Sequence, residues 1–292
     1  MKRSLTFYDE GIRLAGDLFL PDDAKSGEKR AGIVMCHGYA SVKDMHLPHI
    51  AQSLNNSGYV VLTVDYKGWG ESAGPPHRLA PYSRVADVQA AMTCLGLQDE
   101  VDEERIGLCG FSYGGSTVTW AGAVDNRAKC IVSVEGIGNG RRWMSHVRRP
   151  DEWADLLARA KTDREKRVMT GQSELAPRPD LLSLDRESVR ISKEYRAKFE
   201  TSTEQLPLEY VDDTIGFNPE WIVDKISPRA ILFITTDDDR VVLPEESEYL
   251  YANANEPKKL VILKGYSHYG AYAGDGFPEM MKEMLDWYGQ YL

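Results

Sequence analysis

Two segments of the sequence place a serine between glycines in the pattern Gly-x-Ser-x-Gly, one centred on Ser72 and one on Ser112. A serine hydroxyl is a weak nucleophile by itself. In acyl transfer it reacts when a histidine takes its proton and an acidic side chain orients that histidine. With 25 glycines in 292 residues, a bare match carries little weight. The surrounding residues must therefore decide whether either serine is reactive.

Ser112 has the context that a nucleophile needs. It directly follows an apolar run at 106–109 that is typical of a buried strand, and a helical pattern begins behind it. A sharp turn from a strand into a helix lifts a serine hydroxyl above the sheet. Gly110 and Gly114 remove side chains where such a turn is tight. We therefore expect Ser112 to be the nucleophile.

Ser72 lacks this context. At least six loop residues separate it from the strand that ends at Val64, and the pair Pro75-Pro76 prevents a helix from following it. We expect Ser72 to be a loop serine.

Candidate acids and a candidate base follow two later apolar strands. Three aspartates at 237–239 come after the run at 230–234, and His268 comes after the run at 260–263. In open parallel sheets, sites form at the carboxyl ends of the strands. The chain order of the candidates is therefore Ser, Asp, His. We expect the remaining histidines to lie at the surface or to have packing roles: His37, His46, His49, His77 and His146.

The elements around these residues alternate between strands and helices. An apolar alternation at 5–20 predicts a hairpin. Predicted strands lie at 31–36, 59–64, 105–109, 130–134, 230–234 and 260–263, and predicted helices at 47–54, 81–97, 113–123, 244–254 and 278–291. This order predicts a parallel sheet with crossover helices.

The alternation stops between about 136 and 227, where helical patterns replace strands. One helix is predicted at 150–171 and another at 185–202. We interpret the chain as an α/β core domain at 1–136 and 228–292, interrupted by a helical cap insertion at 137–227.

The segment Gly-Phe-Ser-Tyr-Gly-Gly at 110–115, with this order of Ser, Asp and His, resembles the α/β-hydrolase superfamily over about 2–136 and 229–292. Within it, the Asp-Arg-Val-Val segment at 239–242 and the position of the cap look most like dienelactone-hydrolase-like and X-prolyl-peptidase-like serine hydrolases. The resemblance implies an eight-stranded, mostly parallel sheet with an inserted helical cap. It also aligns Asp239 with the family's acid, with Asp238 as the alternative.

The segment His-Gly-Tyr at 37–39 resembles the oxyanion segment of the same superfamily. The resemblance implies that the backbone N–H groups of Tyr39 and Tyr113 face the oxyanion that develops during acyl transfer. The hydroxyl of Tyr39 is a second candidate for contact with the site, and plain packing under the cap is the alternative.

The predicted reaction is hydrolytic acyl transfer without a cofactor or a metal ion. Ser112 attacks a carbonyl, His268 moves the proton and Asp239 orients His268. We expect a small-molecule acyl substrate, with an ester as the default. Alternatives are a peptidase or amidase, a carbon–carbon bond hydrolase on the same triad, and a ligand-binding protein without turnover.

The cap contributes two further candidates. An excess of Lys and Arg between 141 and 198 suggests that Arg148 meets an acidic group of the substrate, although solvated charges explain the same pattern. Trp143 is a candidate for an apolar substrate pocket, and the alternative is that it packs inside the cap.

Composition excludes several classes of protein. Hydrophobic residues make up 42% and charged residues 27% of the chain, as in ordinary globular proteins, and the net charge of −10 argues against a nucleic-acid partner. We expect no membrane partner, because we find no secretory leader and no apolar run long enough to span a bilayer. The four cysteines form no CxxC pair, which favours the cytoplasm. The family resemblance is compatible with a homodimer.

Overall fold

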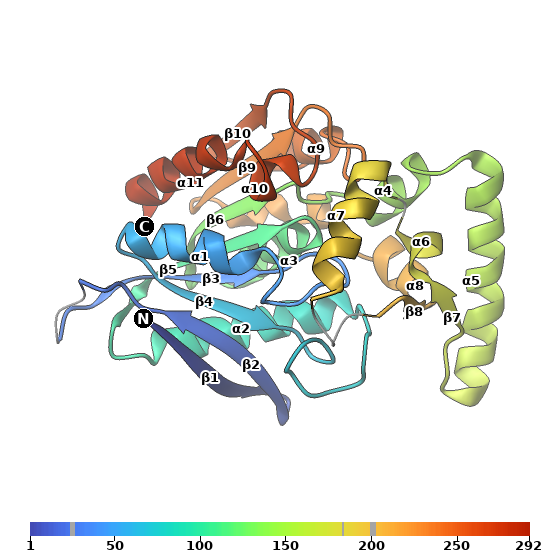
Figure 1. Cartoon of the computed structure of the whole chain (residues 1–292), viewed down its shortest axis with the longest axis horizontal. Coiled ribbons are helices and arrows are strands. Elements are labelled where there is room, and N and C mark those ends of the chain that lie inside the picture. Colours follow the sequence, from blue (N-terminus) through green and yellow to red (C-terminus); the bar gives the residue numbers. More distant parts are fainter. Residues whose placement is uncertain (24–26, 183, 199–202) are drawn as a thin grey trace.

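A computed structural model describes residues 1–23, 27–182, 184–198 and 203–292 (Figure 1). Its main feature is one sheet with the strand order β1-β2-β4-β3-β5-β6-β9-β10. The strands are β1 (Lys2–Asp9), β2 (Ile12–Phe19), β3 (Arg30–Cys36), β4 (Val60–Asp65), β5 (Val101–Phe111), β6 (Ala128–Val134), β9 (Ala230–Thr236) and β10 (Lys258–Leu263). β1 pairs antiparallel with β2, β2 pairs antiparallel with β4, and all other pairs are parallel. The predicted eight-stranded, mostly parallel sheet is confirmed.

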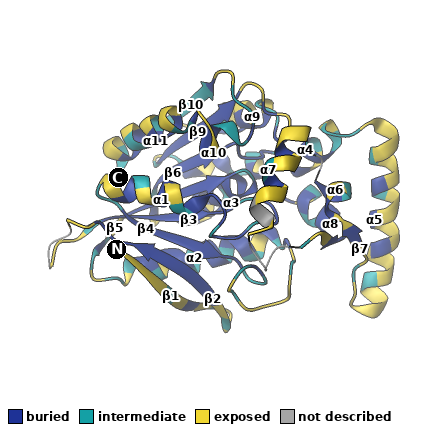
Figure 2. Cartoon of the chain, in the orientation of Figure 1, coloured by how far each residue is buried: buried dark blue, intermediate teal, exposed yellow. Residues whose placement is uncertain are grey.

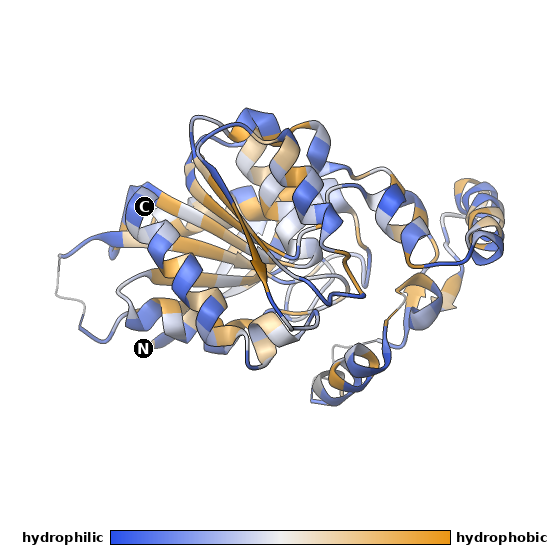
Figure 3. Ribbon diagram, turned by 90° about the horizontal axis from the view of Figure 1, so that it is seen from above, coloured by the Kyte–Doolittle hydropathy of each residue, from blue (hydrophilic) through white to orange (hydrophobic). Residues whose placement is uncertain are grey.

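Helices cover both faces of the sheet, because its central strands are apolar on both sides. On one face pack α2 (Pro81–Gly96), α3 (Tyr113–Val124) and α9 (Glu245–Asn253). On the other pack α1 (Leu47–Asn56), α10 (Gly270–Ala273) and α11 (Phe277–Tyr291). Figure 2 shows the central strands buried and the outer helix surfaces exposed, and in Figure 3 these strands are among the most apolar parts of the molecule.

The segment between β6 and β9 is mainly helical, as predicted. It contains α4 (Gly140–His146), α5 (Pro150–Thr170), α6 (Arg178–Leu181), α7 (Arg186–Arg196), α8 (Tyr210–Ile215), and the 3₁₀ turns η1 (Pro219–Trp221) and η2 (Val223–Ile226). These elements lie beyond one end of the sheet, with α5 at the margin of the molecule (Figure 1). The division into a core and a cap stays a prediction.

Within this segment the sequence predictions hold in part. The helix predicted at 150–171 is α5, which ends at Gly171 in a left-handed conformation. The helix predicted at 185–202 is α7, which ends at Arg196, and positions 199–202 of the prediction lie outside the described residues. The antiparallel strands β7 (Leu175–Pro177) and β8 (Gln205–Pro207) were not predicted, because strands of three residues leave no periodic signal.

Side chains tie the segment between β6 and β9 to the loops at the carboxyl end of the sheet. Arg78 forms an ion pair of 2.8 Å with Glu209, and the carboxylate of Asp213 accepts a hydrogen bond from the N–H of Ala80 at 3.0 Å. Arg142 forms an ion pair of 2.7 Å with Glu246 of α9. These contacts cover the edge of the sheet at which Ser112 lies.

Ser72 has a structural place in the loop after β4. Its hydroxyl donates to the carbonyl oxygen of Asp65 at 2.6 Å and accepts the N–H of Ala15 at 2.9 Å. Both hydrogen bonds link this loop to β2 and β4.

In the described part of the chain, no helix is both long and apolar enough to cross a bilayer.

Candidate active site

Ser112 occupies a sharp turn between β5 and α3. Its backbone has φ 55° and ψ −125°, a conformation that a residue other than glycine rarely adopts. Its N–H donates to the carbonyl oxygen of Val134 at 2.8 Å, which fixes the turn to the end of β6. A Cβ on Gly110 would lie 2.1 Å from the carbonyl oxygen of Gly114, so the first glycine of the motif is required by close packing.

Ser112 and His268 line the same cavity, of about 50 Å³, at the carboxyl ends of the strands. His268 follows β10 and is buried, whereas Ser112 is half-buried. No hydrogen bond joins the Ser112 hydroxyl to the imidazole among the described residues. The structure therefore brings the two side chains to one cavity without a direct hydrogen bond between them, an arrangement that is common at catalytic sites in the absence of substrate.

The three consecutive aspartates lie in different surroundings. Asp237 and Asp238 are exposed, and Asp238 contacts the guanidinium of Arg240 at 3.1 Å. Asp239 is buried, and its Oδ2 accepts a hydrogen bond of 2.7 Å from Nδ1 of His268. With the ring proton on Nδ1, Nε2 is the nitrogen that can accept a proton. The geometry thus favours Asp239 over Asp238 as the partner of His268.

The other carboxylate oxygen of Asp239 is bonded by backbone donors. Its Oδ1 accepts the N–H groups of Val241 and Val242, both at 2.8 Å. Hydrogen bonds from backbone amides favour the charged form of a carboxyl group. Asp239 can therefore balance the positive charge that His268 acquires when it takes a proton.

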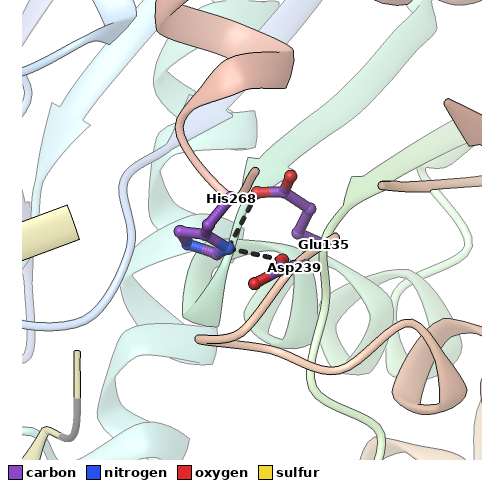
Figure 4. Close-up of side chains that lie close together, drawn as sticks. All are labelled: Glu135, Asp239 and His268. Atoms are coloured by element: carbon purple, nitrogen blue, oxygen red, sulfur yellow. Dashed lines mark hydrogen bonds and ion pairs between the residues drawn. The ribbon is translucent and has the colours of Figure 1, made fainter. Parts of the chain in front are cut away.

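A second carboxyl group, which sequence analysis missed, touches the same imidazole (Figure 4). Glu135 follows β6 and is fully buried, and its Oε2 lies 3.0 Å from Nδ1 of His268. Burial, and next the charge of Asp239, raise the pKa of Glu135 well above its usual range. The only available signal was its position directly after a strand, at the edge where sites form.

The loop after β3 lies against the nucleophile. A Cβ on Gly38 would be 3.2 Å from the Cβ of Ser112, so the backbone of Gly38 packs directly on the serine. In the described structure, the N–H groups of Tyr39 and Tyr113 have no hydrogen-bonding partner. The Tyr39 hydroxyl is 3.5 Å from Oγ1 of Thr214 in α8. The hydroxyl of Tyr39 thus contacts the segment between β6 and β9.

Two buried arginines hold the carbonyl groups of this loop. Arg84 of α2 donates to the carbonyl oxygen of Gly38 at 3.3 Å, and its guanidinium lies 4.4 Å from the ring centre of Tyr66. Arg178 of α6 donates to the carbonyl oxygens of Ala40 at 2.9 Å and Tyr39 at 3.4 Å. Sequence analysis missed both arginines, because nothing in a local pattern separates them from surface arginines.

The structure does not bring Trp143 or Arg148 to the cavity wall. The indole N–H of Trp143 donates to the carbonyl oxygen of Val241 at 2.7 Å, and its ring packs against Tyr39. The guanidinium of Arg148 donates to the carbonyl oxygens of Met144, Asp180 and Leu181. The contacts of Trp143 join the segment between β6 and β9 to the loops after β3 and β9, and those of Arg148 lie within the segment. A role for either residue in substrate binding stays a prediction.

Other histidines surround the cavity. His46, expected at the surface, is buried and lines the cavity beside His37. Burial lowers the pKa of His46 to about 3 and that of His37 well below its usual range. His46 was misplaced because helix α1 begins only at Leu47 and its periodicity does not reach this position. Both rings are uncharged at neutral pH.

A larger cavity of about 380 Å³ adjoins the first. The two share Arg178, Leu182 and Leu184 in their walls, and Val189 of α7 adds a further apolar side chain to the larger one. The small cavity beside Ser112 has room for little more than water or a reacting group. The adjoining space is large enough for a longer apolar part of a substrate.

The described residues contain one group of acids and histidines whose ligand atoms all lie within 4.8 Å of one another: Glu135, Asp239 and His268. In this group Nδ1 of His268 forms its hydrogen bond with Asp239. We therefore interpret the group as a charge arrangement around the imidazole.

Comparison with known proteins identifies the family and supports the fold. The sequence profile of the family described as serine aminopeptidase, S33, matches residues 27–270. An uncharacterized 31.7 kDa protein of Escherichia coli is 29% identical over 261 residues, which are 89% of this chain and 91% of that protein. A thiohydrolase of Eupenicillium brefeldianum is 24% identical over 286 residues, covering 94% of this chain and 89% of that protein.

Among solved structures, the hypothetical protein PA2218 of Pseudomonas aeruginosa superposes with a TM-score of 0.85 at 26% identity, covering 100% of this chain and 94% of that chain. The expected likeness to α/β hydrolases is confirmed. The finer resemblance to dienelactone hydrolases and X-prolyl peptidases stays a prediction.

The close packing of the nucleophile turn gives a test with a matched control. A Cβ on Gly114 would lie 2.4 Å from the carbonyl oxygen of Cys36, so Gly114→Ala should lower the free energy of unfolding by about 2 kcal/mol or more. Gly289 lies in α11 with nothing within 4 Å of such a Cβ, so Gly289→Ala should raise it by about 0.5–1 kcal/mol. Urea unfolding measures both, and a Gly114→Ala protein as stable as the wild type would contradict the packing argument.

Proposed function

Because the chain belongs to the serine aminopeptidase S33 family of the α/β-hydrolase superfamily, we propose that it is a serine hydrolase that cleaves a carboxylic ester or a related acyl bond. The observation that carries the proposal is the hydrogen bond of 2.7 Å between His268 and Asp239, beside a cavity that Ser112 also lines. This arrangement orients an imidazole next to a serine held in a strained turn. The partner is a small-molecule acyl substrate, and the chemistry requires no cofactor.

In the proposed reaction, Ser112 Oγ attacks the carbonyl carbon while Nε2 of His268 takes its proton. The carbonyl oxygen becomes an oxyanion that accepts the N–H groups of Tyr39 and Tyr113. When the carbon–leaving group bond breaks, His268 passes its proton to the leaving group, and an acyl-enzyme remains on Ser112. Water then attacks the acyl-enzyme, and His268 takes a proton from the water. His268 passes this proton to Oγ of Ser112 as the bond between Oγ and the acyl group breaks, which releases the acid.

A thioester is the second candidate substrate. Two observations favour it: a relative is named as a thiohydrolase, and the cavity of about 380 Å³ next to the site has apolar side chains in its wall that an acyl chain can contact, from Leu182, Leu184 and Val189. Amides, lactones and carbon–carbon bonds stay as alternatives, because the fold does not choose among them.

Matched substrates distinguish the two candidates. If the oxygen ester is the substrate, its kcat/KM should equal or exceed that of the thioester of the same acyl chain, and a clear preference for the thioester would favour the second candidate. Both should exceed the corresponding amide at least tenfold. The measurement is steady-state hydrolysis of the three compounds by one preparation. A strong preference for the amide would replace the proposal with a peptidase or amidase.

Labelling with a fluorophosphonate probe tests the nucleophile. We expect the wild type to be labelled and Ser112→Ala to lose labelling, because the probe bonds to an activated serine hydroxyl. Ser72→Ala is the matched control, since it removes the serine of the other Gly-x-Ser-x-Gly segment and should retain labelling. Mass spectrometry of the labelled peptide reads the outcome. An unlabelled wild type, or equal labelling of Ser112→Ala, would contradict the proposal that Ser112 is the nucleophile of a serine hydrolase.

The pH dependence of kcat/KM tests the base. An imidazole has an ordinary pKa of about 6.5, and its protonated form accepts no proton from serine, so kcat/KM should fall on acidification through about pH 6 to 7. His46 lines the same cavity, but its lowered pKa of about 3 keeps it uncharged over this range. The acid limb should therefore persist in His46→Gln. A flat profile to about pH 5 counts against a histidine base, and loss of the limb in His46→Gln would assign it to His46.

A further inference from the structure

Glu135 and Asp239 approach one nitrogen atom from two different strands. Glu135 follows β6, and Asp239 lies in the loop after β9. Their nearest oxygens lie 3.0 Å and 2.7 Å from Nδ1 of His268 (Figure 4). Nδ1 carries a single proton in the active tautomer. The two carboxyl groups therefore cannot both be the main acceptor of its hydrogen bond.

The two carboxyl groups differ in the donors that surround them. Asp239 accepts two backbone N–H groups and the imidazole. Glu135 accepts the Thr236 hydroxyl on Oε1 at 3.4 Å, and its Oε2 has no well-aligned hydrogen bond in the described structure. A buried carboxylate without donors carries a large desolvation cost and takes up a proton instead. The donors that a carboxylate needs are thus gathered around Asp239, whereas burial raises the pKa of Glu135 well above its usual range and favours its neutral form.

The neutral state of Glu135 matters for the base. Two anions in contact with Nδ1 would both favour the imidazolium over the neutral ring, and only the neutral ring accepts a proton from serine. One anion and one neutral acid leave a single negative charge next to the ring. His268 can then be uncharged before the reaction and still find a counter-ion during it.

The backbone holds Glu135 in place. Its φ of 52° lies in the left-handed region, which a glutamate rarely adopts. Its N–H donates to the carbonyl oxygen of Ile234 at 2.7 Å, and a Cβ on the next residue, Gly136, would lie 2.3 Å from Oγ of Ser133. The chain thus keeps an unfavourable backbone conformation at Glu135, the residue after β6 whose carboxyl group contacts Nδ1 of His268.

We propose that Glu135 is a second acid for His268, a positioning residue that is neutral while Asp239 is ionised and able to replace it. If the charge of Asp239 is removed, Glu135 releases its proton to water and becomes the acceptor and counter-ion of the Nδ1–H group. The proposal rests on the proposed function in one respect, that His268 is the base.

Hydrolysis of a p-nitrophenyl ester by four proteins tests the proposal. Glu135→Gln should stay within about threefold of the wild-type kcat/KM, because a neutral amide replaces a neutral acid. Asp239→Ala should lose only about 10- to 100-fold. The double variant should approach the loss of about 10⁴-fold expected for a triad whose histidine has no acid. Asp238→Asn, which changes an exposed neighbour, is the matched control and should leave kcat/KM unchanged.

Titration of the His268 imidazole by NMR, assigned by the signal lost in His268→Gln, gives a reading that needs no turnover. Its pKa should stay within about 0.3 unit in Glu135→Gln and fall slightly in Asp239→Ala. In the double variant it should fall by a further unit or more, as expected when the last anion is removed. If the wild type hydrolyses no ester but these shifts appear, the proposed function fails and the role of Glu135 stands.

Several results would overturn the proposal. Equal kcat/KM and equal His268 titration in Asp239→Ala and the double variant would show that Glu135 does not replace Asp239. A loss in Glu135→Gln as large as in Asp239→Ala would show that Glu135 is ionised in the wild type. Activity lost to a chelator and restored by Zn²⁺ would assign the group to a metal. If Asp239→Ala does not fold, judged by near-ultraviolet circular dichroism, Asp239→Asn with and without Glu135→Gln repeats the comparison.

Discussion

The site depends on the close approach of Gly114, in the first turn of α3, to the end of β3. A side chain at this position would lie 2.4 Å from the carbonyl oxygen of Cys36 and 2.6 Å from that of His37. Only hydrogen at Cα allows the helix to begin there. This contact places Ser112 and the N–H of Tyr113 against the loop that carries Tyr39. The backbone, rather than any side chain, therefore sets how close Ser112 lies to the proposed oxyanion donors.

The charges around this loop act on the same backbone. Arg84 bonds the carbonyl oxygen of Gly38, and that oxygen shares a peptide group with the N–H of Tyr39. A cation at the oxygen draws electron density from the nitrogen, which makes the N–H a stronger donor toward an oxyanion. Arg178 holds the next two carbonyl oxygens of the loop. The two buried arginines thereby act on the loop of the site through its carbonyl oxygens, and not by direct hydrogen bonds to Ser112, Asp239 or His268 in the described structure.

Much of the fold could be predicted from the sequence. Buried strands such as β3 and β9 are continuous apolar runs, and helix α5 begins at a proline and is followed by a capping glycine. Ser112 could be singled out from Ser72 for the same reason, since only one of them follows a buried strand directly. Short pairings such as β7 with β8, and the burial of His46, could not be predicted, because they depend on contacts distant in sequence.

The acidic partner of His268 shows where sequence reasoning ends. Three carboxyl groups follow strands of the sheet: Asp239, Asp238 and Glu135. The resemblance to a known motif placed Asp239 before Asp238 and gave no indication of Glu135. What separates Asp239 from Glu135 is the supply of backbone N–H groups two and three residues later in the chain: Val241 and Val242 donate to Asp239, whereas Glu135 accepts only a hydroxyl of neighbouring β9. That difference of donors is a property of the folded loop. It assigns the negative charge to one of two acids at nearly equal distance from the imidazole.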